Sequence, residues 1–139
     1  MATSELYEIA PLVKITDPRG NLTICEGLQD VPFEIKRVYW SYDVPEGKDR
    51  GAHAHKDLWQ LIVAVHGSFT VNLDNGREKA SVKLSHPWEG LIVKPGTWRT
   101  IEDYSDGGVC MVLASEHYDE NDYIRDYDEF VRWAAAQGK

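Results

Sequence analysis

Two histidines placed two residues apart are the strongest candidates for chemistry in this sequence. His53 and His55 stand within the segment Gly-Ala-His-Ala-His-Lys, and the apolar run 61–65 follows them. On a β-strand this spacing points both imidazoles to the same face, and the apolar run needs burial. We therefore expect both rings to point into the open end of a β-structure, with apolar side chains packed behind them. Imidazole at that place can move protons or bind a metal ion near neutral pH.

The glycines around this pair have the spacing of the first signature of the cupin superfamily, which the sequence resembles. Five residues separate Gly47 from His53, and Gly67 closes the signature. One position departs from it, because Gln60 stands where the superfamily has an acidic metal ligand. The sequence matches the second signature only in part. A Pro-Gly turn is present, but Arg99 falls where the last histidine ligand is expected.

These departures argue against a metal site. A guanidinium is permanently protonated, so Arg99 has no lone pair for a metal and would repel a cation. Two imidazoles and the amide of Gln60 make a poor site for a first-row metal. We expect a pocket without metal or other cofactor, in which His53 and His55 carry out proton transfer. A single histidine would more simply be an ordinary strand residue, but the pair, the glycine spacing and Arg99 together favour function.

Length, charge and cysteine content restrict the classes of protein to which this chain can belong. Its 139 residues are expected to form one domain, 1–139, with a proper hydrophobic core. The formal net charge is −8, so bulk attraction to nucleic acid or anionic membranes is not expected. No apolar run approaches the ~20 residues of a membrane span, and no secretory signal is expected. Cys25 and Cys110 fit no metal or disulfide pattern, which favours a reducing, cytoplasmic location.

Short apolar runs separated by turn residues indicate about ten β-strands, with a turn every ~8–12 residues. This spacing is typical of an all-β sandwich or jelly roll. One long strand is expected over 31–41, with Phe33, Ile35, Arg37 and Tyr39 on one face. That face would begin in the core and end at a polar pocket, although an amphipathic edge strand has the same pattern.

The tail of the chain changes character and predicts a short C-terminal helix. Asp126 or Asp128 can cap a helix that runs to about Gln137. Phe130 begins an apolar stripe with the i, i+3, i+4 spacing of a helix, and Trp133 continues it. We expect this helix to pack on the barrel rim, where it closes an end or covers an edge.

Beyond the cupin signatures, the chain resembles a narrower family, the bacterial sugar 3,4-ketoisomerases of the WxcM-like or FdtA/QdtA type. Two blocks carry most of the resemblance: Arg-Gly-Ala-His-Ala-His-Lys at 50–56 and Tyr-Asp-Glu-Asn-Asp-Tyr-Ile-Arg at 118–125. Supporting matches are found in order along the chain at 17–22, 32–39, 67–68, 73–76 and 95–98. The resemblance implies a cupin-type jelly-roll β-barrel with a short C-terminal helix, and a homodimer that exchanges N-terminal strands.

The same resemblance implies a reaction and a set of roles. The family moves the keto group of a dTDP-linked 4-keto-6-deoxy hexose from C4 to C3, a step in making unusual deoxy or amino sugars such as those of lipopolysaccharide O-antigens. His53 is the expected base for the C3 proton, and His55 is a shuttle or orienter. Six further candidates bind substrate: Arg19 and Arg99 for sugar oxygens or the diphosphate, Tyr39 and Gln60 for hydrogen bonds to the sugar, and Arg37 and Arg50 for the diphosphate.

Three other functions remain open at this point. A nucleotide-sugar epimerase of the related cupin type needs a histidine–carboxylate base and a tyrosine acid, for which Asp103, Asp106 and Tyr104 are available. A sugar-nucleotide-binding cupin without catalytic activity predicts binding with no turnover to lose. A metal-dependent dioxygenase predicts about one iron per chain.

Overall fold

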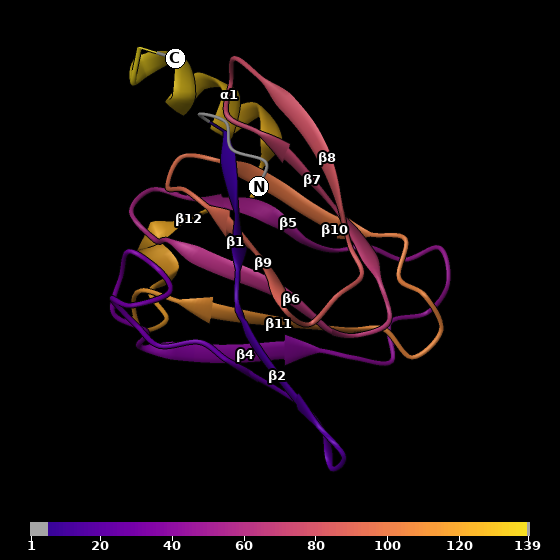
Figure 1. Cartoon of the computed structure of the whole chain (residues 1–139). Coiled ribbons are helices and arrows are strands. Elements are labelled where there is room, and N and C mark those ends of the chain that lie inside the picture. Colours follow the sequence, from indigo (N-terminus) through magenta and orange to yellow (C-terminus); the bar gives the residue numbers. More distant parts are fainter. Residues whose placement is uncertain (1–5, 139) are drawn as a thin grey trace.

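Two five-stranded antiparallel sheets pack against each other in the computed structural model of this protein, which describes residues 6–138 (Figure 1). The first sheet has the order β1 (Tyr7–Pro11), β9 (Glu89–Val93), β6 (Gln60–His66), β11 (Val109–Ala114) and β4 (Arg37–Ser41). The second has the order β12 (Tyr123–Ile124), β5 (Arg50–His55), β10 (Trp98–Glu102), β7 (Phe69–Asp74) and β8 (Lys79–Leu84). This arrangement confirms the predicted all-β jelly roll.

The main core lies between the two sheets. Strand β7 shows how the sequence builds it, because Phe69, Val71 and Leu73 are buried while the residues between them are only partly covered. This period of two is what a strand with one face on the core requires. Each such side chain contributes ~1.5–3 kcal/mol when fully buried. From the first sheet, Ile62 on β6 and Val112 on β11 complete the same cluster.

The long strand predicted over 31–41 was wrong in its first half. Regular pairing begins where the backbone N–H of Lys36 donates to Ala114 (2.9 Å), and β4 covers only 37–41. The preceding residues instead fold over the outer face of the first sheet, where Val31 and Phe33 are buried in a second apolar cluster. Pro32 between them has no N–H to give to a sheet ladder, and burial of its two neighbours outweighs strand propensity.

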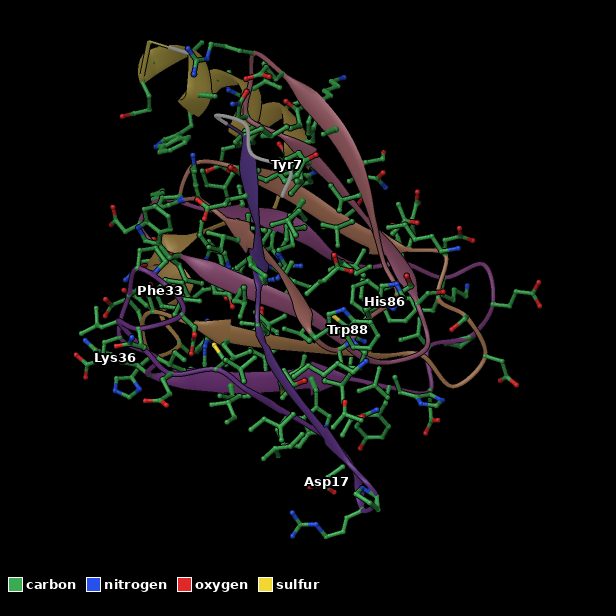
Figure 2. The ribbon with its side chains drawn as sticks, in the orientation of Figure 1. Tyr7, Asp17, Phe33, Lys36, His86 and Trp88 are labelled. Carbon is green, nitrogen blue, oxygen red and sulfur yellow. The ribbon has the colours of Figure 1, made fainter. Side chains whose placement is uncertain are left out.

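A hairpin of β2 (Val13–Asp17) and β3 (Gly20–Ile24) projects from the barrel as a separate two-stranded sheet (Figure 1). Asp17 lies at its far tip (Figure 2) and accepts a hydrogen bond from the backbone N–H of Arg19 (2.8 Å), which closes the turn. At its base, the ammonium group of Lys14 lies 3.8 Å from the ring centre of Trp88. The hairpin therefore extends from a fixed base and makes no strand pairing with the rest of the described chain.

The C-terminal segment closes one edge of the second sheet. A single 3-10 turn, η1 (Glu120–Asp122), leads into β12, which pairs with β5. Helix α1 (Tyr127–Ala136) follows, and its N-cap is Asp126, whose side chain accepts a hydrogen bond from the backbone of Glu129 (3.1 Å). Phe130 of this helix is fully buried against the outward face of β5 and β10. The predicted helix bounds and the cap at Asp126 are confirmed, whereas the edge of β5 is covered by β12 and the helix packs on the face of the sheet. Within residues 6–138, no helix has the length and apolarity needed to cross a membrane.

Candidate active site

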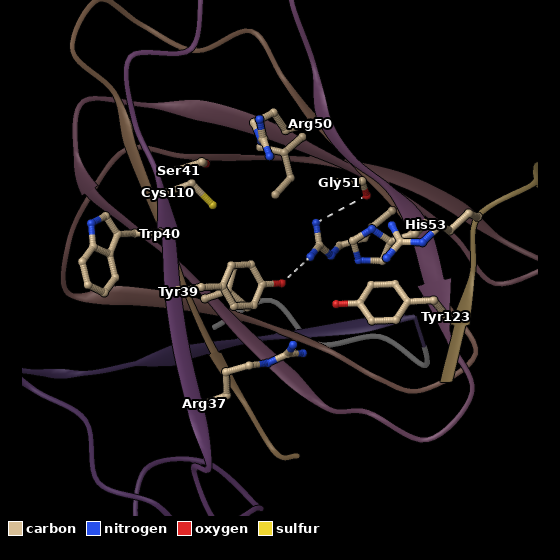
Figure 3. Close-up of a pocket in the computed structure, with 13 residues that line it drawn as sticks. Arg37, Tyr39, Trp40, Ser41, Arg50, Gly51, His53, Cys110 and Tyr123 are labelled. Atoms are coloured by element: carbon tan, nitrogen blue, oxygen red, sulfur yellow. Dashed lines mark hydrogen bonds between the residues drawn. The ribbon is translucent and has the colours of Figure 1, made fainter. Parts of the chain in front are cut away.

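A pocket of about 310 Å³ opens between the two sheets. Its walls come from β4, β5, β10, β11 and β12, so both sheets and the C-terminal segment contribute side chains. Figure 3 shows Tyr39 and Tyr123 pointing their hydroxyl ends toward each other across it, with Arg37 on one side and Arg50 on the other. The pocket is therefore lined by aromatic rings, phenol groups and guanidinium groups.

The two histidines of β5 lie together beside this pocket. Their ring centres are 4.8 Å apart and the planes are almost perpendicular, at 86°. Burial and the charge of Arg99 lower the pKa of His53 to about 2 and the pKa of His55 to about 3. Both imidazoles are therefore neutral at pH 7, and each keeps a lone pair on one ring nitrogen. The Nε2 atom of each is buried without a hydrogen-bond partner in the described part of the protein.

Arg99, Gln60 and Tyr39 form a buried hydrogen-bonded group. Arg99 donates through Nε to Oε1 of Gln60 (2.8 Å) and through Nη2 to the hydroxyl oxygen of Tyr39 (2.9 Å). Gln60 donates through Nε2 to that same hydroxyl oxygen (3.0 Å). Since the oxygen of Tyr39 already accepts two hydrogen bonds, its own proton is free to donate toward the pocket.

Gly51 makes room for this group. It has φ +68°, and a Cβ atom there would overlap the guanidinium of Arg99. Arg99 also lies directly opposite His53 in the pairing of β10 with β5. The close approach of Arg99 to the histidine strand therefore depends on a glycine at position 51.

The C-terminal segment supplies three polar residues to the site. The Nδ1 atom of His55 lies 3.0 Å from Oδ2 of Asp122. The ring of Tyr123 packs at 4.3 Å from that of His55 and at 5.0 Å from that of His53. Arg125 lies 4.1 Å above the ring of Tyr123 and lines the pocket.

Comparison with known proteins agrees with this geometry. The family described as "FdtA: WxcM-like, C-terminal" matches residues 5–135. The chain belongs to the WxcM-like family. The TDP-4-oxo-6-deoxy-alpha-D-glucose-3,4-oxoisomerase of Aneurinibacillus thermoaerophilus is 46% identical over 122 residues, which is 88% of each chain.

Solved structures of WxcM-like relatives superpose closely. A 3,4-ketoisomerase from Helicobacter canadensis gives a TM-score of 0.90 at 43% identity, covering 93% of this chain and 97% of that one. The 3,4-ketoisomerase QdtA from Thermoanaerobacterium thermosaccharolyticum, solved in complex with TDP, gives 0.93 at 38% identity, covering 97% and 98%. ChmJ, a 3'-monoepimerase from Streptomyces bikiniensis, shares the fold alone, with a TM-score of 0.75 at 16% identity over 88% of this chain and 71% of that one. The predicted cupin-type fold is thereby confirmed.

The structure brings most of the predicted site residues of this WxcM-like chain together, but not all. Five of them line the pocket: Arg37, Tyr39, Arg50, His53 and Arg99. His55 adjoins it through His53 and Tyr123. Gln60 is 1% exposed and does not line the pocket. Its side-chain amide is hydrogen-bonded to Arg99 and Tyr39 instead.

Arg19 differs from the other predicted site residues because its side chain is exposed and lies outside the pocket. Its side chain is 90% exposed at the hairpin tip, where it forms an ion pair with Asp17 (2.7 Å). It is not among the residues that line the pocket of its own chain. A role for it in substrate binding stays a prediction.

Sequence reasoning missed Asp122, Tyr123 and Arg125 as site residues. They fall in one of the two blocks that carry the family resemblance, but only the pairing of β12 with β5 brings them to the histidines. The carboxylates considered for an epimerase, Asp103 and Asp106, lie instead in a surface loop. The tyrosine considered with them, Tyr104, is held by a hydrogen bond between its hydroxyl and that of Ser41 (3.0 Å).

The residues around the histidines do not have the composition of a metal site. Across the described range 6–138, no group of three or more His, Cys, Asp or Glu side chains is placed to hold a metal ion. The guanidinium of Arg99 stands opposite His53, where a cation would meet a fixed positive charge. Independence from metal stays a prediction that metal analysis can test.

Proposed function

We propose that this protein is a 3,4-ketoisomerase that moves the keto group of a dTDP-linked 4-keto-6-deoxy hexose from C4 to C3. The single observation that carries the proposal is the pair of buried imidazoles, His53 and His55, beside an arginine-lined pocket. A general base must be unprotonated at the working pH to take up a proton from the carbon next to a carbonyl. The 46% identity to a TDP-4-oxo-6-deoxy-alpha-D-glucose-3,4-oxoisomerase supports the same reaction.

His53 is the proposed base for the C3 proton. The C4 carbonyl acidifies that proton, and its removal gives an enediolate with negative charge on O4. A proton then returns to carbon at C4, and the hydroxyl proton passes from O3 to O4, so that a 3-keto, 4-hydroxy sugar is released. The substrate loses hydrogen from C3 and O3 and gains it at C4 and O4, so the reaction is balanced and needs no oxidant.

The hydroxyl group of Tyr39 is placed to stabilise the developing charge on oxygen. The hydroxyl proton of Tyr39 is free because Arg99 and Gln60 already donate to its oxygen. A donor that is fixed before the reaction begins is worth more than one that has to reorient during it. Gln60 in this proposal positions Tyr39 and Arg99 and does not itself touch the sugar.

The diphosphate is proposed to bind to the pocket arginines. Arg37 and Arg50 enter from opposite sides (Figure 3), and Nε of Arg37 is buried without a hydrogen-bond partner in the described range. Arg125 also lines the pocket and is a further candidate for the diphosphate. Phosphate oxygens match the donor geometry of guanidinium groups. Their negative charge would also offset the arginine charges that lower the pKa of His53, which makes the bound complex a better base than the free protein.

We further propose that two copies associate through the hairpin β2–β3. Val13, Ile15 and Leu22 are 44–57% exposed on it, and an apolar patch of this kind is typical of an interface. Strand β1 pairs with β9 of the same chain, so the exchange of N-terminal strands proposed here involves the hairpin. Arg19 at its tip would then reach the second copy.

The proposed reaction requires no metal and takes place in the cytoplasm. Both cysteines, Cys25 and Cys110, are free thiols, as expected for a reducing compartment. Treatment with a chelator is expected to leave the rate unchanged, and loss of activity that iron restores would instead favour the dioxygenase.

The decisive experiment is proton NMR of the purified protein with dTDP-4-keto-6-deoxyglucose in deuterated water. Loss of the C3 proton signal together with growth of a 3-keto product is the expected result. Exchange at C3 or C5 without migration of the carbonyl would favour the epimerase. An unchanged spectrum despite binding would favour a binding protein without catalytic activity.

A further inference from the structure

Asp122 is held more firmly than a surface carboxylate in a loop would be. Its Oδ1 atom accepts the backbone N–H of Asp57 (2.8 Å), and its own backbone oxygen accepts the N–H of Lys56 (3.0 Å). Its Oδ2 atom faces Nδ1 of His55 at 3.0 Å, across 67 residues of sequence. The side chains of His55 and Asp122 are only 4% and 15% exposed. The carboxylate is therefore fixed against one edge of the imidazole and largely shielded from water.

This contact determines where the single proton of His55 sits. At neutral pH the ring is uncharged, because burial and Arg99 lower its pKa to about 3. A neutral imidazole has one N–H, and an ionised carboxylate can only accept. The proton must then be on Nδ1, so that the Nε2 atom keeps a lone pair. That Nε2 atom is buried without a partner in the described range, in a ring that packs against His53 and Tyr123 of the pocket.

We propose that Asp122 is a positioning residue that holds His55 as the Nδ1–H tautomer and so presents the Nε2 lone pair for proton transfer. The proposal rests on the ketoisomerase function and deepens it, because that reaction needs a second proton carrier. His53 takes the proton from C3, while the hydroxyl proton must still pass from O3 to O4. The Nε2 atom of His55 accepts the O3 proton and returns it to O4, so His55 ends as it began.

Asp122 also stabilises the charged form of His55 that exists between these two transfers. Arg99, Arg37 and Arg125 all disfavour a positive charge on that ring. A carboxylate at hydrogen-bond distance offsets them at the one moment when the imidazole is protonated. Without it, the transfer would create an unpaired positive charge among three guanidinium groups.

Replacement by asparagine separates these roles from a structural one. The amide side chain has one oxygen where the carboxylate has two, and the fixed N–H of Asp57 needs that oxygen. The NH₂ group of Asp122→Asn must therefore face Nδ1 of His55, which forces the proton onto Nε2. The lone pair is then turned away from the substrate while the fold is unchanged. A carboxylate-to-amide change of this kind beside a catalytic histidine is the case that established tautomer control in serine proteases.

Asp119→Asn is the matched control. Asp119 lies in the same turn, and its carboxylate accepts the backbone N–H of Asn121 (3.0 Å) as N-cap of η1. Asparagine caps a helix as well as aspartate does. This variant carries the same change in charge and chemistry three residues from Asp122, but at an exposed side chain.

The test measures turnover and the ring nitrogens of His55 separately. For Asp122→Asn we expect kcat to fall by at least ~10²-fold with KM almost unchanged, since correctly placed acid–base groups typically contribute that much. Nitrogen-15 NMR without substrate should show the protonated nitrogen of His55 moving from Nδ1 to Nε2. Asp119→Asn should change neither quantity.

Several results would overturn the proposal. Unchanged turnover in Asp122→Asn would refute it. Lost turnover with the His55 proton still on Nδ1 would also refute it, because the role of Asp122 would then be structural. An Nε2–H tautomer in the unmodified protein would refute it even if the variant does not fold. If the unmodified protein shows no turnover at all, the ketoisomerase function fails, whereas the nitrogen spectra still decide whether Asp122 sets the tautomer.

Discussion

At the scale of single residues, the roles proposed for His53 and His55 differ because the surroundings of the two side chains differ. His53 lines the pocket opposite Arg99, whereas His55 adjoins Asp122. We expect His53→Asn to lower turnover by at least ~10²-fold, as loss of a general base does, with the melting temperature nearly unchanged. The exposed His66 offers a control, and His66→Asn should behave as the unmodified enzyme. Near-normal turnover in His53→Asn would transfer the role of base to His55.

Tyr39 allows a second test at the same scale. Tyr39→Phe keeps the ring and removes the one proton that Arg99 and Gln60 leave free. Removal of one preset donor to a developing oxyanion costs ~10²–10³-fold in kcat, and we expect a loss in that range with smaller effect on KM. Tyr42→Phe, at an exposed position past the end of β4, should have no effect. A change in KM alone would mean that Tyr39 only binds the ground state.

At the scale of elements, features that depend on one strand were predicted from the sequence, whereas contacts that depend on the pairing of two segments were missed. The spacing of His53 and His55 fixes their common face whatever the strand pairs with. Asp122 reaches them only because β12 pairs with the edge of β5, and two residues of strand are too short to leave a pattern. The partners of Arg99 were hidden for the same reason, since Tyr39 belongs to the other sheet.

The early part of the predicted strand 31–41 failed for a different physical reason. Alternation of apolar and polar residues was present there, but burial of Val31 and Phe33 in the outer cluster decided the conformation. A local pattern does not reveal which apolar surface lies nearby. Helix α1, whose cap and apolar stripe are local features, was predicted almost to the residue.

The hairpin β2–β3 is the element whose prediction concerns assembly. Leu22 is 57% exposed on it, so Leu22→Glu removes little packing within one chain but places a charge in the proposed interface. We expect this variant to be monomeric in analytical ultracentrifugation while the unmodified protein is dimeric. Val131→Glu, on an exposed face of α1, makes the same chemical change elsewhere and should leave the dimer intact. A dimer that survives Leu22→Glu would locate the interface away from the hairpin.

At the scale of the whole molecule, the buried histidines make stability depend on pH. Their pKa values are lowered from 6.5 to about 2 for His53 and about 3 for His55. Below pH 6.5 the unfolded chain binds protons at these positions and the folded protein does not, so acid favours unfolding. The free energy of unfolding should fall by about 1 kcal/mol per pH unit for each histidine between pH 6 and 5.

Urea denaturation at pH 7, 6 and 5 measures this dependence. His53→Asn should show a shallower fall than the unmodified protein because one of the two protonations is gone. His66→Asn, at an exposed site, should retain the full slope. Equal slopes in all three proteins would mean that the carboxylates alone govern acid sensitivity.

The arginines of the pocket lie within a chain whose formal net charge is −8. A nucleotide sugar carrying a diphosphate is therefore repelled at long range and attracted only once it reaches the guanidinium groups. Salt at physiological concentration shortens the screening length to about 8 Å, which weakens the distant repulsion before it weakens the contacts inside the pocket. Capture of the substrate should consequently speed up as salt is first added, the reverse of enzymes that steer their substrates by an attractive field. Stopped-flow binding of TDP at rising ionic strength would reveal this sign.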